Sequence, residues 1–181
     1  MLFRSSILNY NAPAGILFNS TDKTLTASFP VLNIIKPCVV RGTEIVRYAV
    51  GKCEIAKIED IRVGDMVINQ DAKLVRVLEH RCNKILTDSW TAPHIIPTDF
   101  FGRGKPYKPL FISGDHGILH DRSNTGSVSR VYPYRLAGTF RRLPVNTQVE
   151  YHHLLLEDDK YNFFIANGLA VESLHKGVYS S

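Results

Sequence analysis

Short runs in which apolar and polar residues alternate recur along this chain, separated by turn-forming residues. The run from Val39 to Val50 ends at Gly51-Lys52, and a second run continues from Cys53 to Ile58. Further runs follow at Met66-Val67-Ile68 and from Leu74 to Leu78. Alternation with a period of two is typical of strands, and closely spaced turns are typical of antiparallel sheets. The pattern therefore predicts an all-β fold built from short strands.

The middle of the chain, from Thr91 to Pro109, is rich in proline and glycine. Proline cannot donate a hydrogen bond within a sheet or continue a helix, so this segment predicts a long loop with an edge strand. Beyond it, the runs from Val149 to Leu156 and from Tyr161 to Ala166 predict a hairpin whose turn is Glu157 to Lys160. Leu136 to Leu143 is the one short helix that the pattern favours.

Residues 1–37 differ in composition from the rest of the chain. They combine Asn, Thr, Ser and Pro with two apolar patches, Gly15 to Phe18 and Val31 to Ile35. These patches predict either two strands that pair with a neighbour or an extended segment. The 181 residues, 44% of them apolar, suffice for one compact domain. We therefore expect a leader at 1–37, one domain at 38–177 and a tail at 178–181.

The chain has a net charge of +5, but its Lys and Arg residues are scattered, and the longest basic cluster is the pair Arg141-Arg142. Nucleic-acid binding needs a concentrated basic surface, so no nucleic-acid partner is expected. No apolar run approaches the roughly 20 residues of a membrane helix. Asn9, Asn11 and Pro13 interrupt what would be the apolar core of a signal peptide. We therefore expect a protein of the cytoplasm or of an assembled particle.

The three cysteines, Cys38, Cys53 and Cys82, are odd in number and form no CxxC pair. This pattern argues against a disulfide framework and against a structural zinc site, so neither a metal nor another cofactor is expected. Cys53 lies beside a predicted hairpin turn and Cys82 lies between Arg81 and Asn83, without a partner at ligand spacing.

Three motifs follow one another in an order that carries chemical meaning. Cys38 to Ile45 comes first, Ser113-Gly114-Asp115-His116 second, and Asn162 to Leu169, with Asn167-Gly168 near its end, third. Together they resemble the self-processing domain shared by hedgehog proteins and inteins, the Hint domain, over roughly Cys38 to Gly177. The long loop and the ending are most similar to bacterial Hint domains that are not inteins. The resemblance implies a horseshoe or disc of short antiparallel strands with a long Pro- and Gly-rich loop.

The resemblance also assigns candidate chemistry. It makes Cys38 the nucleophile that attacks the carbonyl of Pro37 to give a thioester, with the N-terminal segment as the protein's own substrate. His116 is the candidate general acid for the leaving amide nitrogen, because imidazole titrates near neutral pH. Ser113 is expected to orient His116 or to donate a hydrogen bond at the scissile peptide, where an oxyanion develops. The supporting residues carried over from the motifs are Thr43, Asp115, Asn167 and Gly168.

Two departures from the intein pattern limit this chemistry. An intein ends in His-Asn, whereas this chain has Glu172-Ser173-Leu174 at the matching positions, so neither splicing nor C-terminal cleavage is expected. Thioester formation would then be followed by release of residues 1–37 to water, an amine, a thiol or an alcohol. Pro37 stiffens the backbone before the nucleophile and is expected to slow the rearrangement.

Two other functions are compatible with the sequence. One is a non-catalytic Hint scaffold, a structural or interaction protein that docks through residues 1–37 onto a protein partner or into a larger, virion-like assembly. The other is a sugar- or ligand-binding β barrel, which only the aromatic content favours. Single residues also have structural interpretations: Ser113 and Asp115 as turn residues, and His152 and His153 as strand residues of which one faces solvent.

Overall fold

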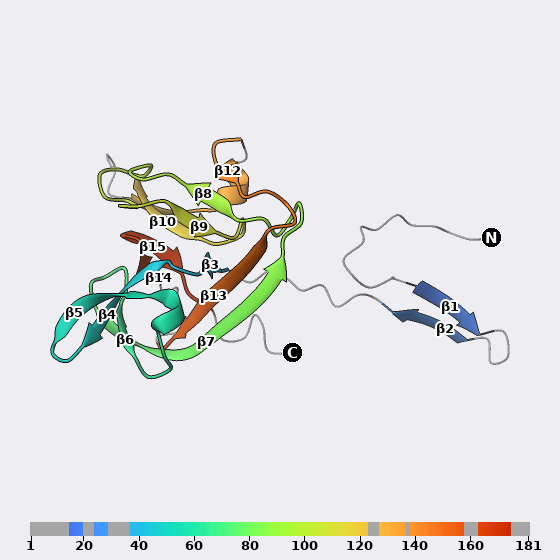
Figure 1. Cartoon of the computed structure of the whole chain (residues 1–181), viewed down its shortest axis with the longest axis horizontal. Helices are drawn as coiled ribbons and strands as arrows, with labels where there is room; N and C mark the ends of the chain where they lie inside the picture. The colour runs from blue at the N-terminus through green and yellow to red at the C-terminus, as the bar shows by residue number, and fades with distance from the viewer. Residues whose placement is uncertain are drawn as a thin grey trace. The chain divides into compact units, whose positions relative to one another are not determined.

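The computed structural model describes residues 15–19, 24–28, 37–122, 127–136, 138–157 and 163–174. The chain divides into two compact units, residues 1–34 and residues 35–181 (Figure 1). In the first unit, strand β1 (Gly15–Asn19) pairs antiparallel with β2 (Thr24–Ser28). The first apolar patch of the leader therefore forms a strand that pairs within its own unit. The second patch, Val31 to Ile35, lies outside the described residues.

The second unit is built from one continuous antiparallel sheet. Its strands are β3 (Val39–Val40), β4 (Glu44–Ala49), β5 (Lys52–Lys57), β6 (Met66–Ile68), β7 (Leu74–Leu86), β8 (His94–Ile96), β9 (Leu110–Ile112), β10 (Ile118–Arg122), β11 (Ser127–Val131), β12 (Arg141–Arg142), β13 (Gln148–Leu156), β14 (Phe163–Ala166) and β15 (Leu169–Glu172). Neighbouring strands follow the order β11-β10-β15-β14-β4-β6-β7-β13-β3-β9-β8-β12, and β5 pairs with β4. Among the described residues the helices are two short 3₁₀ helices, Ile58–Asp60 and Pro133–Leu136. The predicted all-β fold is confirmed.

The two longest strands, β7 and β13, lie side by side and span the sheet (Figure 1). Their pairing begins with Gln148 opposite Leu86 and ends with Leu156 opposite Val77. At its other edge β13 pairs with β3. Every residue of β13 from Tyr151 to Leu154 is buried, instead of every second one, so both faces of this strand are covered.

The larger of two hydrophobic clusters among the described residues joins strands that are distant in the sequence. Its fully buried side chains include Val39 of β3, Ile45 of β4, Ile112 of β9, Leu154 of β13 and Phe164 of β14. Burying a side chain of this size contributes roughly 1.5–3 kcal/mol. The core therefore holds the start of β3, the end of β9 and the centre of β13 against one another.

Two sequence-based expectations about strands are wrong. β7 continues to Leu86, past the expected end at Leu78, because it pairs with β13 along most of its length. The run from Val149 and the run from Tyr161 do not form a hairpin with each other: β13 pairs with β7 and β3, whereas β14 pairs with β15 and β4. Of the predicted turn, residues 158–160 lie outside the described residues.

The expected helix and the expected edge strand also differ from the structure. The 3₁₀ helix ends at Leu136, and the short strand β12 occupies Arg141–Arg142, inside the segment that was expected to be helical. Within the Pro- and Gly-rich segment, β8 is not an edge strand, because it pairs with β9 on one side and with β12 on the other. These two pairings fix the loop that follows β8 on the sheet.

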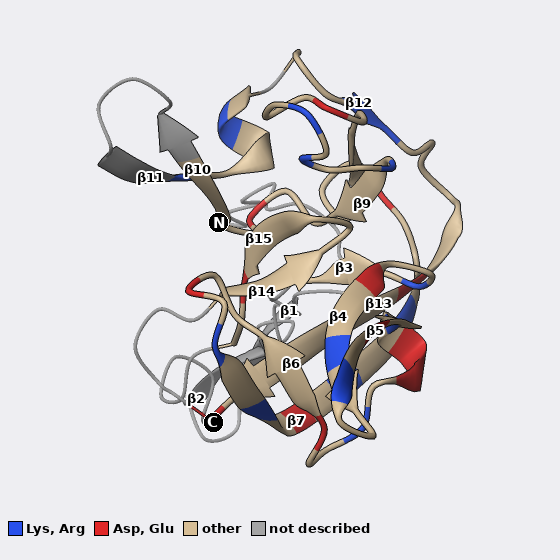
Figure 2. Cartoon of the chain, turned by 90° about the vertical axis from the view of Figure 1, so that its left-hand side faces the viewer, with Lys and Arg blue, Asp and Glu red and all other residues tan. Residues whose placement is uncertain are grey.

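The charges of the second unit are dispersed. Figure 2 shows Lys and Arg on separate strands and loops, interspersed with Asp and Glu. Several are paired: Arg47 contacts both Glu54 and Asp65, and Arg130 contacts Glu172. None of the helices in the described part of the chain is long and apolar enough to span a membrane.

Candidate active site around Cys38

Strand pairing brings three distant segments together at Cys38, which lies immediately before β3. Val39 pairs with Ile112 of β9 on one side and with His152 of β13 on the other. The residues that follow these two partners in the sequence, Ser113 and His153, therefore both lie next to Cys38. The sheet thus assembles a site from positions that are 75 and 115 residues away from Cys38.

Ser113 holds the backbone of Cys38 on both sides. The amide N–H of Cys38 donates to Oγ of Ser113 at 3.0 Å, and the amide N–H of Ser113 donates to the carbonyl oxygen of Cys38 at 2.9 Å. The hydroxyl therefore accepts a hydrogen bond from the nitrogen of the Pro37–Cys38 peptide instead of donating one there. The Ser113 hydroxyl donates its own proton to Asp115. This hydrogen bond lowers the pKa of the Asp115 carboxyl, but burial raises that pKa by more.

His116 is fully buried beside the same peptide. Its Nε2 donates to the carbonyl oxygen of Glu172 at 2.8 Å, which leaves Nδ1 as the acceptor nitrogen of the neutral ring. No described group completes a hydrogen bond of normal geometry to Nδ1. Burial lowers the pKa of His116, while the nearby backbone of Cys38 and the backbone of Glu172 raise it. The ring is therefore neutral near pH 7.

His153 lies at the sulfur of Cys38. Its Nδ1 is 3.6 Å from Sγ, and the side chains of both residues are buried. Sulfur forms longer hydrogen bonds than oxygen, so this separation places a base within reach of the thiol proton. The expectation that His152 or His153 faces solvent is wrong, since each is only 2% exposed.

The sequence contained one signal for His153. Successive side chains of a strand alternate between faces, so Val149, Tyr151 and His153 point the same way. Val149 and Tyr151 pack in one apolar cluster with Cys38, and His153 continues this face to the sulfur. Burial, followed by the nearby Cys38 and Asp115, raises the pKa of Tyr151 far above its usual value. Tyr151 thus remains a neutral wall of the site.

The family profile described as the Hint domain matches residues 37–178. The chain belongs to the Hint family. No curated protein matches this Hint domain.

Solved structures with a similar fold include two intein-related proteins. The bacterial intein-like domain from Clostridium thermocellum is 16% identical, with a TM-score of 0.48, and its match covers 76% of this chain and 98% of that chain. The gp41-1 intein is 13% identical, with a TM-score of 0.47 and coverage of 77% and 99%.

Thr43 and Asn167, also carried over from the motifs, fasten turns of the Hint domain. Thr43 closes the turn after β3, because its amide and its hydroxyl both donate to the carbonyl oxygen of Val40. Asn167 accepts from the amide of Glu44 at 2.8 Å and donates to the carbonyl of Pro109 at 3.1 Å. It therefore ties the β14–β15 turn to β4 and to the long loop.

Gly168 and Gly114 both lie close to other residues of this Hint domain. Gly168 has a φ of 85°, in the left-handed region, and a Cβ at this position would lie 2.7 Å from the carbonyl oxygen of Gly104. At Gly114, in the turn between Ser113 and His116, a Cβ would lie 2.9 Å from Cε1 of His94. The second glycine allows His94 to cover the turn that carries the candidate acid.

Proposed function

We propose that this Hint domain performs an N–S acyl shift at the Pro37–Cys38 peptide, with residues 1–37 as its own substrate. The proposal is carried by one observation: Nδ1 of His153, a base, lies 3.6 Å from the sulfur of Cys38, and the amide nitrogen of Cys38 is hydrogen-bonded to Ser113 next to the buried His116. Cys38 supplies both the nucleophile, its sulfur, and the leaving group, its amide nitrogen. His153 contacts the sulfur and Ser113 contacts the nitrogen.

In the first step His153 accepts the thiol proton, and the thiolate attacks the carbonyl carbon of Pro37. His116, which is neutral at rest, takes up a proton from solvent, and the carbon–nitrogen bond breaks as the imidazolium gives that proton to the amide nitrogen of Cys38. Burial lowers the pKa of His116, which makes its protonated form a stronger acid for this poor leaving group. His153 returns the thiol proton to solvent, and one proton passes from solvent through His116 to nitrogen. The step therefore consumes no net proton and gives a thioester plus a free amine on Cys38.

Asp115 and Ser113 are proposed to support this proton transfer. The carboxylate of Asp115 and the backbone of Glu172 both raise the pKa of His116 against the effect of burial, so they stabilise the imidazolium when it forms. Ser113 keeps the leaving nitrogen in place through its hydrogen bond of 3.0 Å. Positioning of this kind lowers the entropy that is lost on reaching the transition state.

The thioester would then be cleaved by water, an amine, a thiol or an alcohol, which releases residues 1–37. Splicing is not part of the proposal, because Glu172, Ser173 and Leu174 occupy the end of the domain where an intein carries His-Asn. In this proposal residues 1–37 are the released leader, residues 38–177 are the self-processing Hint domain, and residues 178–181 are a C-terminal tail.

Intact-mass spectrometry of the purified chain, with and without dithiothreitol or hydroxylamine, tests the proposal. Both reagents cleave thioesters, so a fragment ending at Pro37 is expected to accumulate and to carry the added nucleophile. Cys38→Ala is expected to abolish the fragment, and Cys53→Ala, which removes an exposed thiol, is expected to leave it unchanged. Removing a general base slows such reactions by about 10²–10⁴, and this loss is expected for His153→Gln.

A chain that remains whole under both reagents would refute the acyl shift and leave a non-catalytic Hint scaffold as the better account. Equal cleavage in wild type and His153→Gln would instead retain the acyl shift and remove His153 from it.

A further inference from the structure

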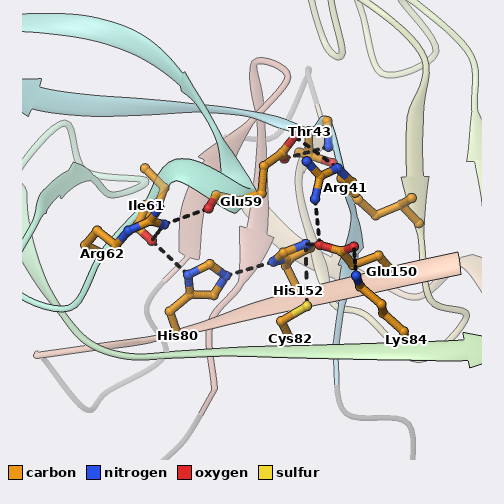
Figure 3. A network of polar contacts seen from close by, with 12 residues as sticks. Arg41, Thr43, Glu59, Ile61, Arg62, His80, Cys82, Lys84, Glu150 and His152 are labelled. Carbon is orange, nitrogen blue, oxygen red and sulfur yellow. Dashed lines mark hydrogen bonds and ion pairs between the residues drawn. The ribbon is translucent and has the colours of Figure 1, made fainter.

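A second group of reactive side chains lies on the β7–β13 ribbon, separate from the contacts around Cys38. In the antiparallel register Cys82 stands directly opposite His152, and Lys84 stands opposite Glu150. Because side chains alternate along a strand, these four and His80 project from one face of the ribbon. Figure 3 shows these side chains next to one another, with Arg41 hydrogen-bonded to Glu150.

The hydrogen bonds in this group cannot all be satisfied by neutral imidazoles. Nδ1 of His80 lies 2.8 Å from the carbonyl oxygen of Ile61, Nε2 of His80 lies 2.8 Å from Nδ1 of His152, and Nε2 of His152 lies 3.0 Å from Oε1 of Glu150. Both ends of this series are oxygen acceptors, so its three contacts need three protons. Two neutral imidazoles supply two. The series therefore requires one additional cation.

A metal ion can replace the third proton at the contact between Nε2 of His152 and Oε1 of Glu150, which lie 3.0 Å apart. The other two contacts each take one of the two imidazole protons: Nδ1–H of His80 donates to the carbonyl oxygen of Ile61, and Nδ1–H of His152 donates to Nε2 of His80. The remaining nitrogen of His152 then presents its lone pair beside the carboxylate.

Cys82 adds a third ligand atom beside this pair. Its Sγ lies 3.9 Å from Nε2 of His152, and the ligand atoms of Cys82, Glu150 and His152 all lie within 4.8 Å of one another. Zinc bonds of about 2.3 Å to sulfur and about 2.0 Å to nitrogen require a similar separation between the ligand atoms. We propose that Cys82 Sγ, Glu150 Oε1 and His152 Nε2 form a zinc-binding site whose fourth position is open to solvent.

His80 is proposed to orient this site without binding the metal. Its hydrogen bond to Ile61 fixes the proton on Nδ1, so its Nε2 accepts from His152 and keeps the other nitrogen of His152 deprotonated. A second hydrogen-bonded group of this kind raises the basicity of a metal-bound histidine. The combination of thiolate, imidazole and carboxylate favours zinc over calcium or magnesium, which prefer oxygen ligands alone.

Two cations compete with the metal for Glu150. Nη1 of Arg41 lies 2.9 Å from Oε1, and Nζ of Lys84 lies 3.3 Å from Oε2. Lys84 occupies the other carboxylate oxygen, so it leaves the proposed ligand atom accessible. Arg41 is largely exposed and also lies 3.6 Å from Glu59, to which it can turn when a metal takes Oε1. Replacing Arg41 with glutamine is therefore expected to tighten metal binding.

Titration of the full chain with Co²⁺ tests this site, because a cobalt–thiolate bond gives a charge-transfer band in the near ultraviolet. We expect a band that saturates at one Co²⁺ per chain and disappears on addition of Zn²⁺. Cys82→Ser and His152→Gln are expected to abolish it. Cys53→Ser, which alters another exposed thiol, and Cys38→Ala are expected to retain it. His80→Gln is expected to weaken binding about 10–100-fold while keeping the band.

The controls separate this proposal from the acyl shift, on which it does not rest. A band that disappears in Cys38→Ala but persists in Cys82→Ser would assign the metal to the candidate nucleophile and overturn the proposal. Absence of any cobalt–thiolate band in the wild-type chain would overturn it as well. Far-UV circular dichroism of Cys82→Ser and His152→Gln, unchanged from wild type, is required for their loss of the band to count as support.

Discussion

Replacing Gly168 with alanine measures how firmly the Asn167-Gly168 turn is held against the long loop. The backbone of Gly168 is left-handed, with a φ of 85°, and a Cβ would lie 2.7 Å from the carbonyl oxygen of Gly104 and 2.8 Å from Cδ1 of Tyr107. A left-handed alanine costs about 1–2 kcal/mol, and overpacking against a backbone atom costs about 1–3 kcal/mol more. The free energy of unfolding is therefore expected to fall by about 2–5 kcal/mol.

Gly51→Ala is the matched control, because Gly51 is also left-handed, with a φ of 79°, but a Cβ there would have no other atom within 4 Å. Its loss is expected to be the conformational part alone, about 1–2 kcal/mol. Urea unfolding followed by far-UV circular dichroism suits both variants, since the single tryptophan, Trp90, is 64% exposed and reports poorly on the core. The measurements use a Cys38→Ala background to exclude cleavage. Equal losses in the two variants would refute the close approach at Gly168.

Two further predictions concern the core and the buried His94. Leu154→Ala removes a fully buried side chain and is expected to cost about 2–5 kcal/mol in urea unfolding, against at most about 0.5 kcal/mol for the exposed Leu86→Ala. Burial, followed by the charge of Arg142, lowers the pKa of His94 to about 4. Below pH 6.5 the unfolded chain therefore binds a proton at His94 that the folded chain does not bind. The free energy of unfolding consequently falls as the pH drops toward 4. His94→Gln is expected to reduce that fall by about 3 kcal/mol between about pH 7 and about pH 4, and urea midpoints that fall as steeply as in wild type would contradict it.

The sequence predicts the fold class better than it predicts strand partners. Alternation along β4 and β5 with Gly51 between them marks a hairpin, because both strands and their turn are adjacent in the chain. The same kind of pattern at residues 149–166 suggested a hairpin that does not exist. β13 and β14 each find both of their partners elsewhere, and alternation carries no information about which distant strand a segment joins.

Part of the candidate site could likewise be predicted from the sequence, and part could not. The motif order pointed to Cys38, Ser113 and His116, and these lie together in the structure, whereas Thr43 and Asn167 fasten turns. His153 was not expected, because on a strand with both faces covered alternation no longer separates an inner residue from an outer one. Cys82 and His152 are separated by 70 residues, so their pairing depends on a register that no local spacing encodes.

His152 and His153 are adjacent on β13, so the register of this one strand determines the surroundings of both Cys82 and Cys38. His152 points to Cys82 and His153 to Cys38, on opposite sides of one strand. A slip of β13 by one position reverses every side chain's facing. A slip in one direction would place His152 beside Cys38 and Tyr151 beside Cys82. A slip in the other direction would place His153 beside Cys82 and Leu154 beside Cys38. Neither slip leaves a histidine beside both cysteines. An insertion or deletion that shifts the register of β13 therefore removes at least one of the two histidine–cysteine contacts, even where the protein still folds.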